Sequence, residues 1–109
     1  MYEDNELSKI YVGLNGDNLY YAKLVSTRLM DSLCDMDDIV TTGDHDGNIT
    51  FTLDKIHKKT GLKAVSPVTF EWVAKQFLKV DEPLIKIDEG DKVTLTEKGR
   101  KWCKVKKGA

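Results

Sequence analysis

The 109-residue chain has few of the residues that carry catalysis or metal binding. It contains two histidines and two cysteines, and Cys34 and Cys103 lack the spacing of a zinc site. The sequence shows no glycine-rich phosphate loop and no paired nucleophile and base. We therefore predict a protein that is not an enzyme and that has no metal and no cofactor.

Long apolar runs and secretion signals are also missing. No apolar stretch approaches the roughly 18 residues that cross a membrane, and the N-terminus carries no charged-then-apolar signal pattern. These absences predict a cytoplasmic protein. In that reducing compartment Cys34 and Cys103 are expected to be free thiols, with one long-range disulfide as the alternative.

The segment from Asp37 to Asn48 is the stretch that comes nearest to a metal-binding loop. Placing Gly47 at the glycine of a calcium loop makes Thr42 the first ligand and Leu53 the last, so two carboxylates that calcium needs are missing. We expect a turn-forming loop instead, followed by a short strand from Ile49 to Thr52.

The formal net charge of −1 hides a strong asymmetry along the chain. Residues 1–46 contain three Lys or Arg and ten Asp or Glu, a net charge of −7, whereas residues 47–109 contain fourteen and eight, a net charge of +6. This segregation indicates a basic face on an otherwise acidic body. The apolar fraction of 40% and the charged fraction of 32% are typical of one globular domain.

Capping residues define two helices in the basic half. Thr52 is a good N-cap and Gly61 a good C-terminal stop, which predicts a short helix between them. Ser66 followed by Pro67 begins a second helix that should run to about Val80. Apolar residues recur at helical spacing in the second helix and give it a buried face of Phe70, Val73, Ala74 and Phe77.

Two alternating runs follow the second helix. Ile85 to Ile87 and Val93 to Leu95 alternate apolar and polar residues, and an acidic turn that contains Gly90 separates them. This pattern predicts a β-hairpin, which the strand from Ile49 to Thr52 joins as the third strand of a small sheet.

The last residues are short and basic. Thr96 should cap a final turn through Arg100 and Trp102, with Trp102 held against the core. The tail that follows, KVKKGA, is either a solvated end or an additional arm that contacts phosphates.

The acidic half is predicted to be helical. Leu7 to Leu14 has apolar residues at helical spacing, and a helix is favoured over the hairpin that Asn15-Gly16 would also allow. A longer helix, capped by Asp17, should reach Met36. Its apolar stripe is broad enough for the core and for a partner helix in a homodimer.

The run VTLTEKGRKW, from Val93 to Trp102, resembles the second wing strand and following helix of MarR-type and related winged-helix transcription regulators, in which V-x-L-T-x-x-G is common. The resemblance extends over Ile49 to Trp102. It implies an α+β fold, a winged helix-turn-helix with a three-helix core, a small antiparallel sheet and a β-hairpin wing at residues 17–109, after an N-terminal extension at residues 1–16. His57 and Thr60 depart from the usual pattern, which has a small and an apolar residue there.

These features together predict a small DNA-binding protein, a transcription regulator whose helix at residues 66–80 enters the major groove of double-stranded DNA. Gln76 is a candidate for pairing with adenine, and Lys75 and Lys79 could reach guanine or phosphate. Ser66 and the helix N-terminus would bind a phosphate. The predicted site consists of Lys58, Lys59, Lys63, Ser66, Thr69, Trp72, Lys75, Gln76 and Lys79.

The alternative is a winged-helix module that binds another protein. An exposed Trp72 at the middle of the helix more often contacts protein than bases, so Trp72 would be the anchor. The wing tip, with Asp88, Glu89 and Asp91, would be repelled by phosphates and is expected to stay away from a DNA backbone.

Overall fold

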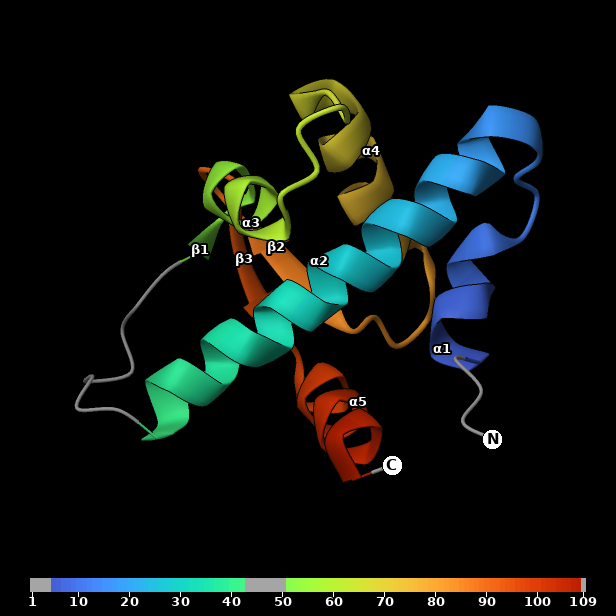
Figure 1. Cartoon of the computed structure of the whole chain (residues 1–109). Coiled ribbons are helices and arrows are strands. Elements are labelled where there is room, and N and C mark those ends of the chain that lie inside the picture. The colour runs from blue at the N-terminus through green and yellow to red at the C-terminus, as the bar shows by residue number, and fades with distance from the viewer. Residues whose placement is uncertain (1–4, 43–50, 109) are drawn as a thin grey trace.

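The computed structural model describes residues 5–42 and 51–108 and shows an α+β protein. Figure 1 shows α2 crossing the molecule, with α3 and α4 on one side of it and α5 on the other. The predicted α+β class with a small antiparallel sheet is confirmed. In chain order the elements are α1 (Asn5–Ser8), the 3-10 helix η1 (Lys9–Tyr11), α2 (Gly16–Thr42), β1 (Phe51–Thr52), α3 (Leu53–Thr60), α4 (Pro67–Gln76), the 3-10 helix η2 (Phe77–Lys79), β2 (Ile85–Asp88), β3 (Lys92–Leu95) and α5 (Glu97–Gly108).

The long helix α2 supplies one wall of the core. It packs against α3, α4 and α5, and the predicted apolar stripe is confirmed because its central residues are buried. The homodimer suggested by the breadth of the stripe stays a prediction. Among the residues of α2 whose burial is described, 16–36, the fully buried ones are Ala22, Val25, Ser26, Leu29, Met30 and Leu33.

The ends of α2 differ from the prediction. The helix begins at Gly16, so Asp17 lies in its first turn, and it continues to Thr42 instead of ending at Met36. Residues 37–42, predicted as a loop, are helical because the sequence places neither Gly nor Pro there to stop the helix. The rest of the calcium-like loop, residues 43–50, lies outside the described residues. Among the helices that the structure describes, even the 27-residue α2 is not apolar enough to cross a membrane.

The two predicted helices of the basic half are confirmed, with their caps. The Thr52 hydroxyl accepts a hydrogen bond from Lys55 N at 3.2 Å, and Gly61 ends α3 with φ +73°. The Ser66 hydroxyl accepts from Thr69 N at 3.1 Å, and Pro67 is the first residue of α4. After Gln76 the helix tightens into η2, so the helical segment ends within a residue of its predicted end. Its predicted buried face is also confirmed.

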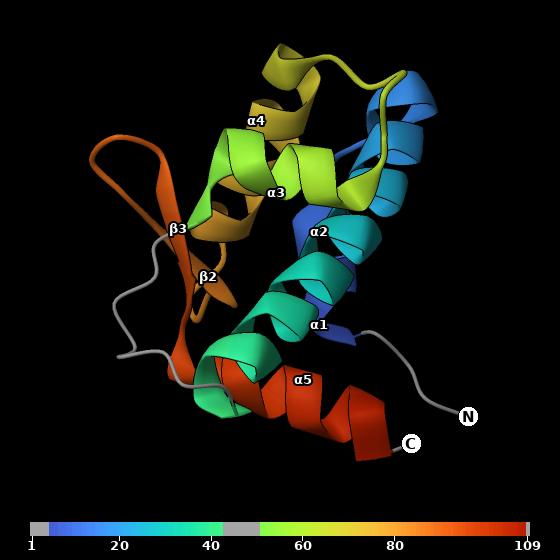
Figure 2. The same cartoon turned by 60° about the vertical axis from the view of Figure 1, so that its left-hand side comes forward.

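The sheet is antiparallel, with strand order β1-β3-β2. Phe51 pairs with Val93, and Ile85 pairs with Leu95, so the predicted hairpin and a third strand are confirmed. Of the strand predicted from Ile49 to Thr52, β1 contains Phe51 and Thr52, and residues 49 and 50 lie outside the described residues. Figure 2 shows the hairpin projecting beside α3. Its turn is held against α3 by a hydrogen bond of 3.0 Å from Leu53 N to the carbonyl oxygen of Asp91.

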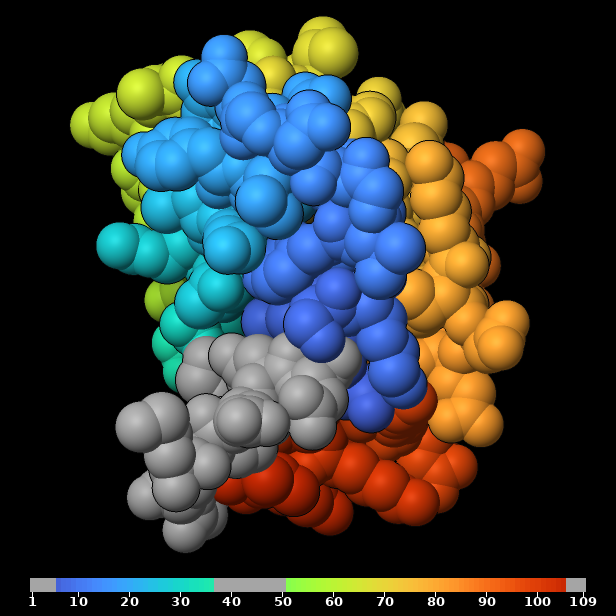
Figure 3. Space-filling model, turned by 90° about the vertical axis from the view of Figure 1, so that its right-hand side faces the viewer, coloured from blue at the N-terminus to red at the C-terminus, as the bar shows by residue number. Residues whose placement is uncertain are grey.

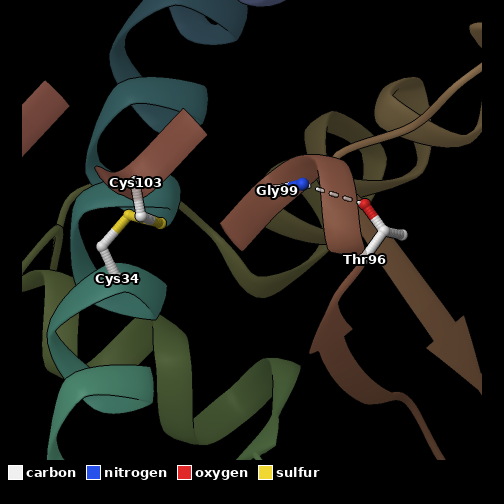
Figure 4. Close-up of a disulfide and its surroundings, with 4 residues drawn as sticks. All are labelled: Cys34, Thr96, Gly99 and Cys103. Atoms are coloured by element: carbon white, nitrogen blue, oxygen red, sulfur yellow. Dashed lines mark hydrogen bonds between the residues drawn. A yellow bond between two sulfur atoms is a disulfide. The ribbon is translucent and has the colours of Figure 1, made fainter. Parts of the chain in front are cut away.

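The C-terminal helix α5 is longer than the predicted final turn. Thr96 is its cap, because its hydroxyl accepts a hydrogen bond from Gly99 N at 3.1 Å (Figure 4). The same hydroxyl donates to the carbonyl oxygen of Pro83 at 2.7 Å. The following helix runs to Gly108. Trp102 is buried, with 5% of its surface exposed, as predicted.

The expectation of free thiols is wrong. Cys34 of α2 and Cys103 of α5 form a disulfide, with their Cα atoms 5.6 Å apart (Figure 4). The alternative of one long-range disulfide is therefore confirmed. Both cysteines are nearly buried, at 6% and 7% exposure, so the disulfide belongs to the core.

The N-terminal segment forms two short helices rather than a hairpin. Leu7 and Ile10 are buried in the same core cluster as α2, and the Tyr11 hydroxyl lies 2.8 Å from the hydroxyl of the fully buried Ser26. Figure 3 shows this segment, in blue, covering one face of the molecule above α5. Residues 5–11 therefore share the core of the rest of the chain.

One ion-pair network ties the N-terminal segment to α5. The Lys98 ammonium lies 2.9 Å from Glu6 and 3.1 Å from Glu82. Its hydrogen bond to Glu6 holds the pKa of that carboxyl below the ordinary value of 4.5. The same hydrogen bond raises the pKa of Lys98 above its ordinary value of 10.5, with Glu82 contributing in the same direction.

Replacing Lys98 with Met should lower the thermal unfolding midpoint at about pH 7 and have little effect at about pH 2.5. Because the pKa of Glu6 is lower in the folded protein, the pair stabilises it above pH 4.5, and this stability is lost as the pH falls through the lowered pKa. Thermal unfolding followed by circular dichroism at both pH values measures the effect. Lys101→Met is the control, because Lys101 lies 3.8 Å from Glu97 and both side chains are largely exposed. An equal loss by Lys98→Met at both pH values would contradict the prediction.

Candidate nucleic-acid interface

The lysines of the predicted site lie on α3, α4 and η2 and in the turn between α3 and α4, residues 61–66. Residues 53–80 contain six lysines and two acidic residues, a net charge of +4. All six ammonium-bearing side chains belong to exposed residues, so this charge faces solvent. The six are Lys55, Lys58, Lys59, Lys63, Lys75 and Lys79.

Two of these lysines have acidic neighbours on their own helix. Lys58 lies 3.2 Å from Asp54, and Lys75 lies 3.8 Å from Glu71. Among the described residues Lys63 makes no ion pair. Because exposed pairs of this kind contribute little, a phosphate could compete for the paired ammonium groups as well.

The predicted role of Gln76 is wrong. This residue is buried, with 6% of its surface exposed, and its side-chain amide donates to the carbonyl oxygen of Trp72 at 3.2 Å. The helix that carries Gln76 packs against α2, so part of its surface is unavailable to a ligand. Gln76 therefore cannot reach a base in this structure.

Trp72 and Thr69 are only partly exposed. Trp72 packs against the hydrophobic core, so the predicted exposed anchor is half-buried. The Thr69 hydroxyl accepts a hydrogen bond of 3.0 Å from Ser66. The most exposed apolar side chain of α4 is instead Val68, at 76% exposure, which the sequence prediction did not include. Its position, one residue after the helix-starting Pro67, was the available signal.

The N-terminus of α4 has few free hydrogen-bond donors for an anion. The Ser66 hydroxyl already accepts from Thr69 N and donates to the Thr69 hydroxyl. Pro67 has no N–H group. The charge for holding a phosphate must therefore come mainly from the neighbouring Lys58, Lys59 and Lys63 rather than from Ser66.

The two departures from the usual helix-turn-helix pattern are structural. The His57 ring stacks on Phe70, with centroids 4.6 Å apart, and its Nε2 lies 3.0 Å from the carbonyl oxygen of Leu62. The Thr60 hydroxyl donates to the carbonyl oxygen of His57 and accepts from Leu62 N. His57 is thus a packing residue, and Thr60 is a buried polar residue with its hydrogen bonds made.

The surface between α4 and the hairpin is acidic. A small hollow of about 200 Å³ lies there, with Asp54, Glu71 and Asp91 among its lining residues and Phe70 in its wall. Residues 81–96, which include the hairpin, contain two lysines and five acidic residues, a net charge of −3. Phosphates would be repelled on this side, so the basic surface is the side of α3 and the turn.

The positive charge of α5 is largely compensated. Residues 97–109 contain six basic residues and one acidic residue, a net charge of +5. However, Lys98 is paired with Glu6 and Glu82, and the disulfide holds α5 against the part of α2 that carries Asp31 and Asp35. In Figure 1 this end of the molecule lies on the other side of α2 from α3 and α4. A DNA backbone bound by α3 and α4 would not meet it.

Comparisons of the chain with models of protein families, with curated proteins and with solved structures found no match in any of the three. The charges and contacts described above are therefore the basis for assigning a function.

Proposed function

We propose that this protein is a winged helix-turn-helix domain that binds double-stranded DNA through α3, α4 and the turn between them. The order of elements supports the proposal: helix α2, strand β1, helices α3 and α4, and then the β2–β3 hairpin, with β3 between β1 and β2 in the sheet. In such domains the second helix of the motif enters the major groove. Here that helix is α4.

The observation that carries the proposal is the net charge of +4 on residues 53–80, all of it contributed by exposed lysines. Neutralising phosphates releases counterions from DNA, and this release supplies most of the affinity of a basic surface. Lys58, Lys59 and Lys63 contact the backbone beside the groove. Lys75 and Lys79 follow on the exposed side of the helical segment and reach phosphates or guanine.

The acidic hairpin limits how the duplex lies. Asp88, Glu89 and Asp91 are exposed at the hairpin turn, so the wing would repel a DNA backbone instead of gripping it. Specific reading of bases would fall to Lys75, because Gln76 is buried. We therefore expect binding that depends strongly on salt and only weakly on sequence.

Replacing Lys75 and Lys79 together with Ala should weaken DNA binding and reduce the slope of log affinity against log salt by about 2. Each lysine that leaves a phosphate contact removes about one released counterion. Fluorescence anisotropy with a labelled random-sequence duplex, measured over a series of salt concentrations, gives the slope.

The control is Lys101→Ala with Lys104→Ala, which removes two exposed lysines from α5. This variant should keep the wild-type slope, because α5 lies away from the proposed interface. If the variant with Ala at positions 75 and 79 kept the wild-type salt slope, Lys75 and Lys79 would not belong to the interface. No binding of the wild type even at low salt would overturn the DNA proposal and favour a role in protein interaction.

A further inference from the structure

We propose that a depression between α3 and α4 binds an acidic peptide segment of a partner protein that carries one apolar anchor residue. This depression, called the α3–α4 depression below, lies at the last turn of α3, the 61–66 turn and the first residues of α4. It adjoins the acidic hollow beside the hairpin, with which it shares Asp54, His57 and Pro67. The proposal assigns a protein ligand to a surface that the DNA proposal treats only as a source of phosphate contacts.

The α3–α4 depression has the size and lining of a binding site. Its volume is about 620 Å³, within the range of about 300–1,000 Å³ that small-ligand pockets have. The apolar part of its lining consists of Leu62, Ala64, Val65 and Pro67. A single Leu or Phe side chain of a peptide could bury its apolar surface there.

The walls of the depression are held in place by hydrogen bonds within the turn. Lys63 N donates to the carbonyl oxygen of Gly61 at 2.9 Å, and Val65 N donates to that of Leu62 at 3.2 Å. The Leu62 carbonyl oxygen also lies within hydrogen-bond distance, 3.0 Å, of His57 Nε2. The depression is therefore present before a ligand arrives, which lowers the entropy lost on binding.

The polar groups of the lining determine the charge of the ligand. The Ser66 hydroxyl and the His57 Nε2 already make hydrogen bonds within the cap of α4 and the turn. The lining cations are the ammonium groups of Lys58 and Lys63, and the one lining carboxylate, Asp54, pairs with Lys58 at 3.2 Å. Ammonium groups beside an apolar floor complement a ligand that presents carboxylates on either side of an apolar side chain.

This complementarity favours a peptide over a nucleic acid at the depression. A duplex backbone presents charge without an apolar side chain to fill the floor formed by Leu62 and Val65. An acidic peptide with a Phe or Leu presents both. Because it would use Lys58 and Lys63, it would compete with DNA, a consequence that rests on the proposed DNA-binding function.

The test uses three labelled pentapeptides and the full chain, with binding followed by fluorescence anisotropy. The peptide EEFEE should bind with a saturable curve. EEGEE lacks the anchor and QQFQQ lacks the charge. Each should bind with an affinity at least about tenfold lower than that of EEFEE. Equal binding of EEFEE and EEGEE would show attraction by charge alone and overturn the proposal, as would the absence of saturable binding by EEFEE.

The variant Lys63→Glu tests whether the peptide binds at the α3–α4 depression. It should weaken binding of EEFEE about tenfold, whereas Lys104→Glu, which makes the same charge change on α5, should leave binding within about twofold. Lys63 is exposed and makes no ion pair among the described residues, so the variant should fold normally. Equal effects of the two variants would overturn the assignment to this depression.

A second measurement separates this proposal from the proposed function. Addition of EEFEE to a preformed complex of the protein with duplex DNA should release the DNA, and EEGEE should release about tenfold less at the same concentration. The peptide assays contain no DNA. A protein that binds EEFEE but no duplex would contradict the proposed function alone, and one that binds duplex but no EEFEE would contradict the peptide site alone.

Discussion

Reduction of the Cys34–Cys103 disulfide should lower the free energy of unfolding by about 4 kcal/mol. The two cysteines are 69 positions apart in the sequence, and a cross-link over so long a loop removes much of the conformational freedom of the unfolded chain. The link also holds α5 against α2, two elements that are far apart in sequence and meet only after folding. A small domain whose total stability is about 5–15 kcal/mol would lose a large part of it.

Urea unfolding with and without a dithiol reductant measures this loss on one unchanged sequence. The double variant Cys34→Ala, Cys103→Ala is the control, because its unfolding midpoint should match that of the reduced protein and should not respond to the reductant. Alanine is the suitable replacement, since both positions are almost buried. The same midpoint for oxidised and reduced wild-type protein would contradict the prediction.

Replacing Gly99 with Ala should destabilise the protein by about 3 kcal/mol. A Cβ atom at this position would lie 2.1 Å from the carbonyl oxygen of Leu84 and 3.0 Å from Cδ2 of Leu95. The first contact is with backbone, so α5 or the segment before β2 would have to move. Such a movement would also disturb the hydrogen bond of 3.0 Å from Thr96 N to the same Leu84 oxygen.

The intrinsic helix propensities of Gly and Ala would favour the Gly99→Ala variant. Ala is favoured over Gly within a helix by about 1 kcal/mol, so a loss of stability by Gly99→Ala must come from the close approach to Leu84. Thermal unfolding of Gly99→Ala and of Lys101→Ala gives the comparison, because Lys101 is exposed on the same helix and its replacement should be nearly neutral. If Gly99→Ala were as stable as the wild type, α5 would not be closely held at this point.

These contacts give physical reasons for two residues of the V-x-L-T-x-x-G run. Thr96 both caps α5 and donates to Pro83, and Gly99 lets the first turn of α5 approach the backbone at Leu84. The sequence indicated both residues through the resemblance, but their partners before β2 lie more than ten positions away. The local sequence pattern indicates that the start of α5 is constrained, but it does not identify the distant residues that α5 contacts.

The helices whose ends are marked by local capping residues were predicted correctly. Thr52, Gly61, Ser66 and Pro67 satisfy helix termini within a few residues of themselves, so their effect can be read from the sequence. The predicted end of α2 at Met36 is too early, because no Gly or Pro occurs between Met36 and Gly43 to stop the helix. A helix continues through polar residues when nothing interrupts its backbone.

The site was predicted less well than the fold. The lysines are exposed as expected, because long charged side chains seldom become buried. The burial of Gln76 and the half-burial of Trp72 depend on how α4 packs against the rest of the fold, including α2, which the periodicity of α4 alone cannot reveal. The disulfide likewise depends on α2 and α5 lying side by side, which no local pattern shows.

The link between Cys34 and Cys103 also makes most of the chain a closed covalent ring. Residues 34–103 include α3, α4 and all three strands. A single break in the backbone anywhere within the ring leaves its two pieces attached to each other. The proposed DNA-binding helix therefore stays joined to α2 after such a cut, and pulling on the two ends of the chain would load the disulfide instead of extending the sheet.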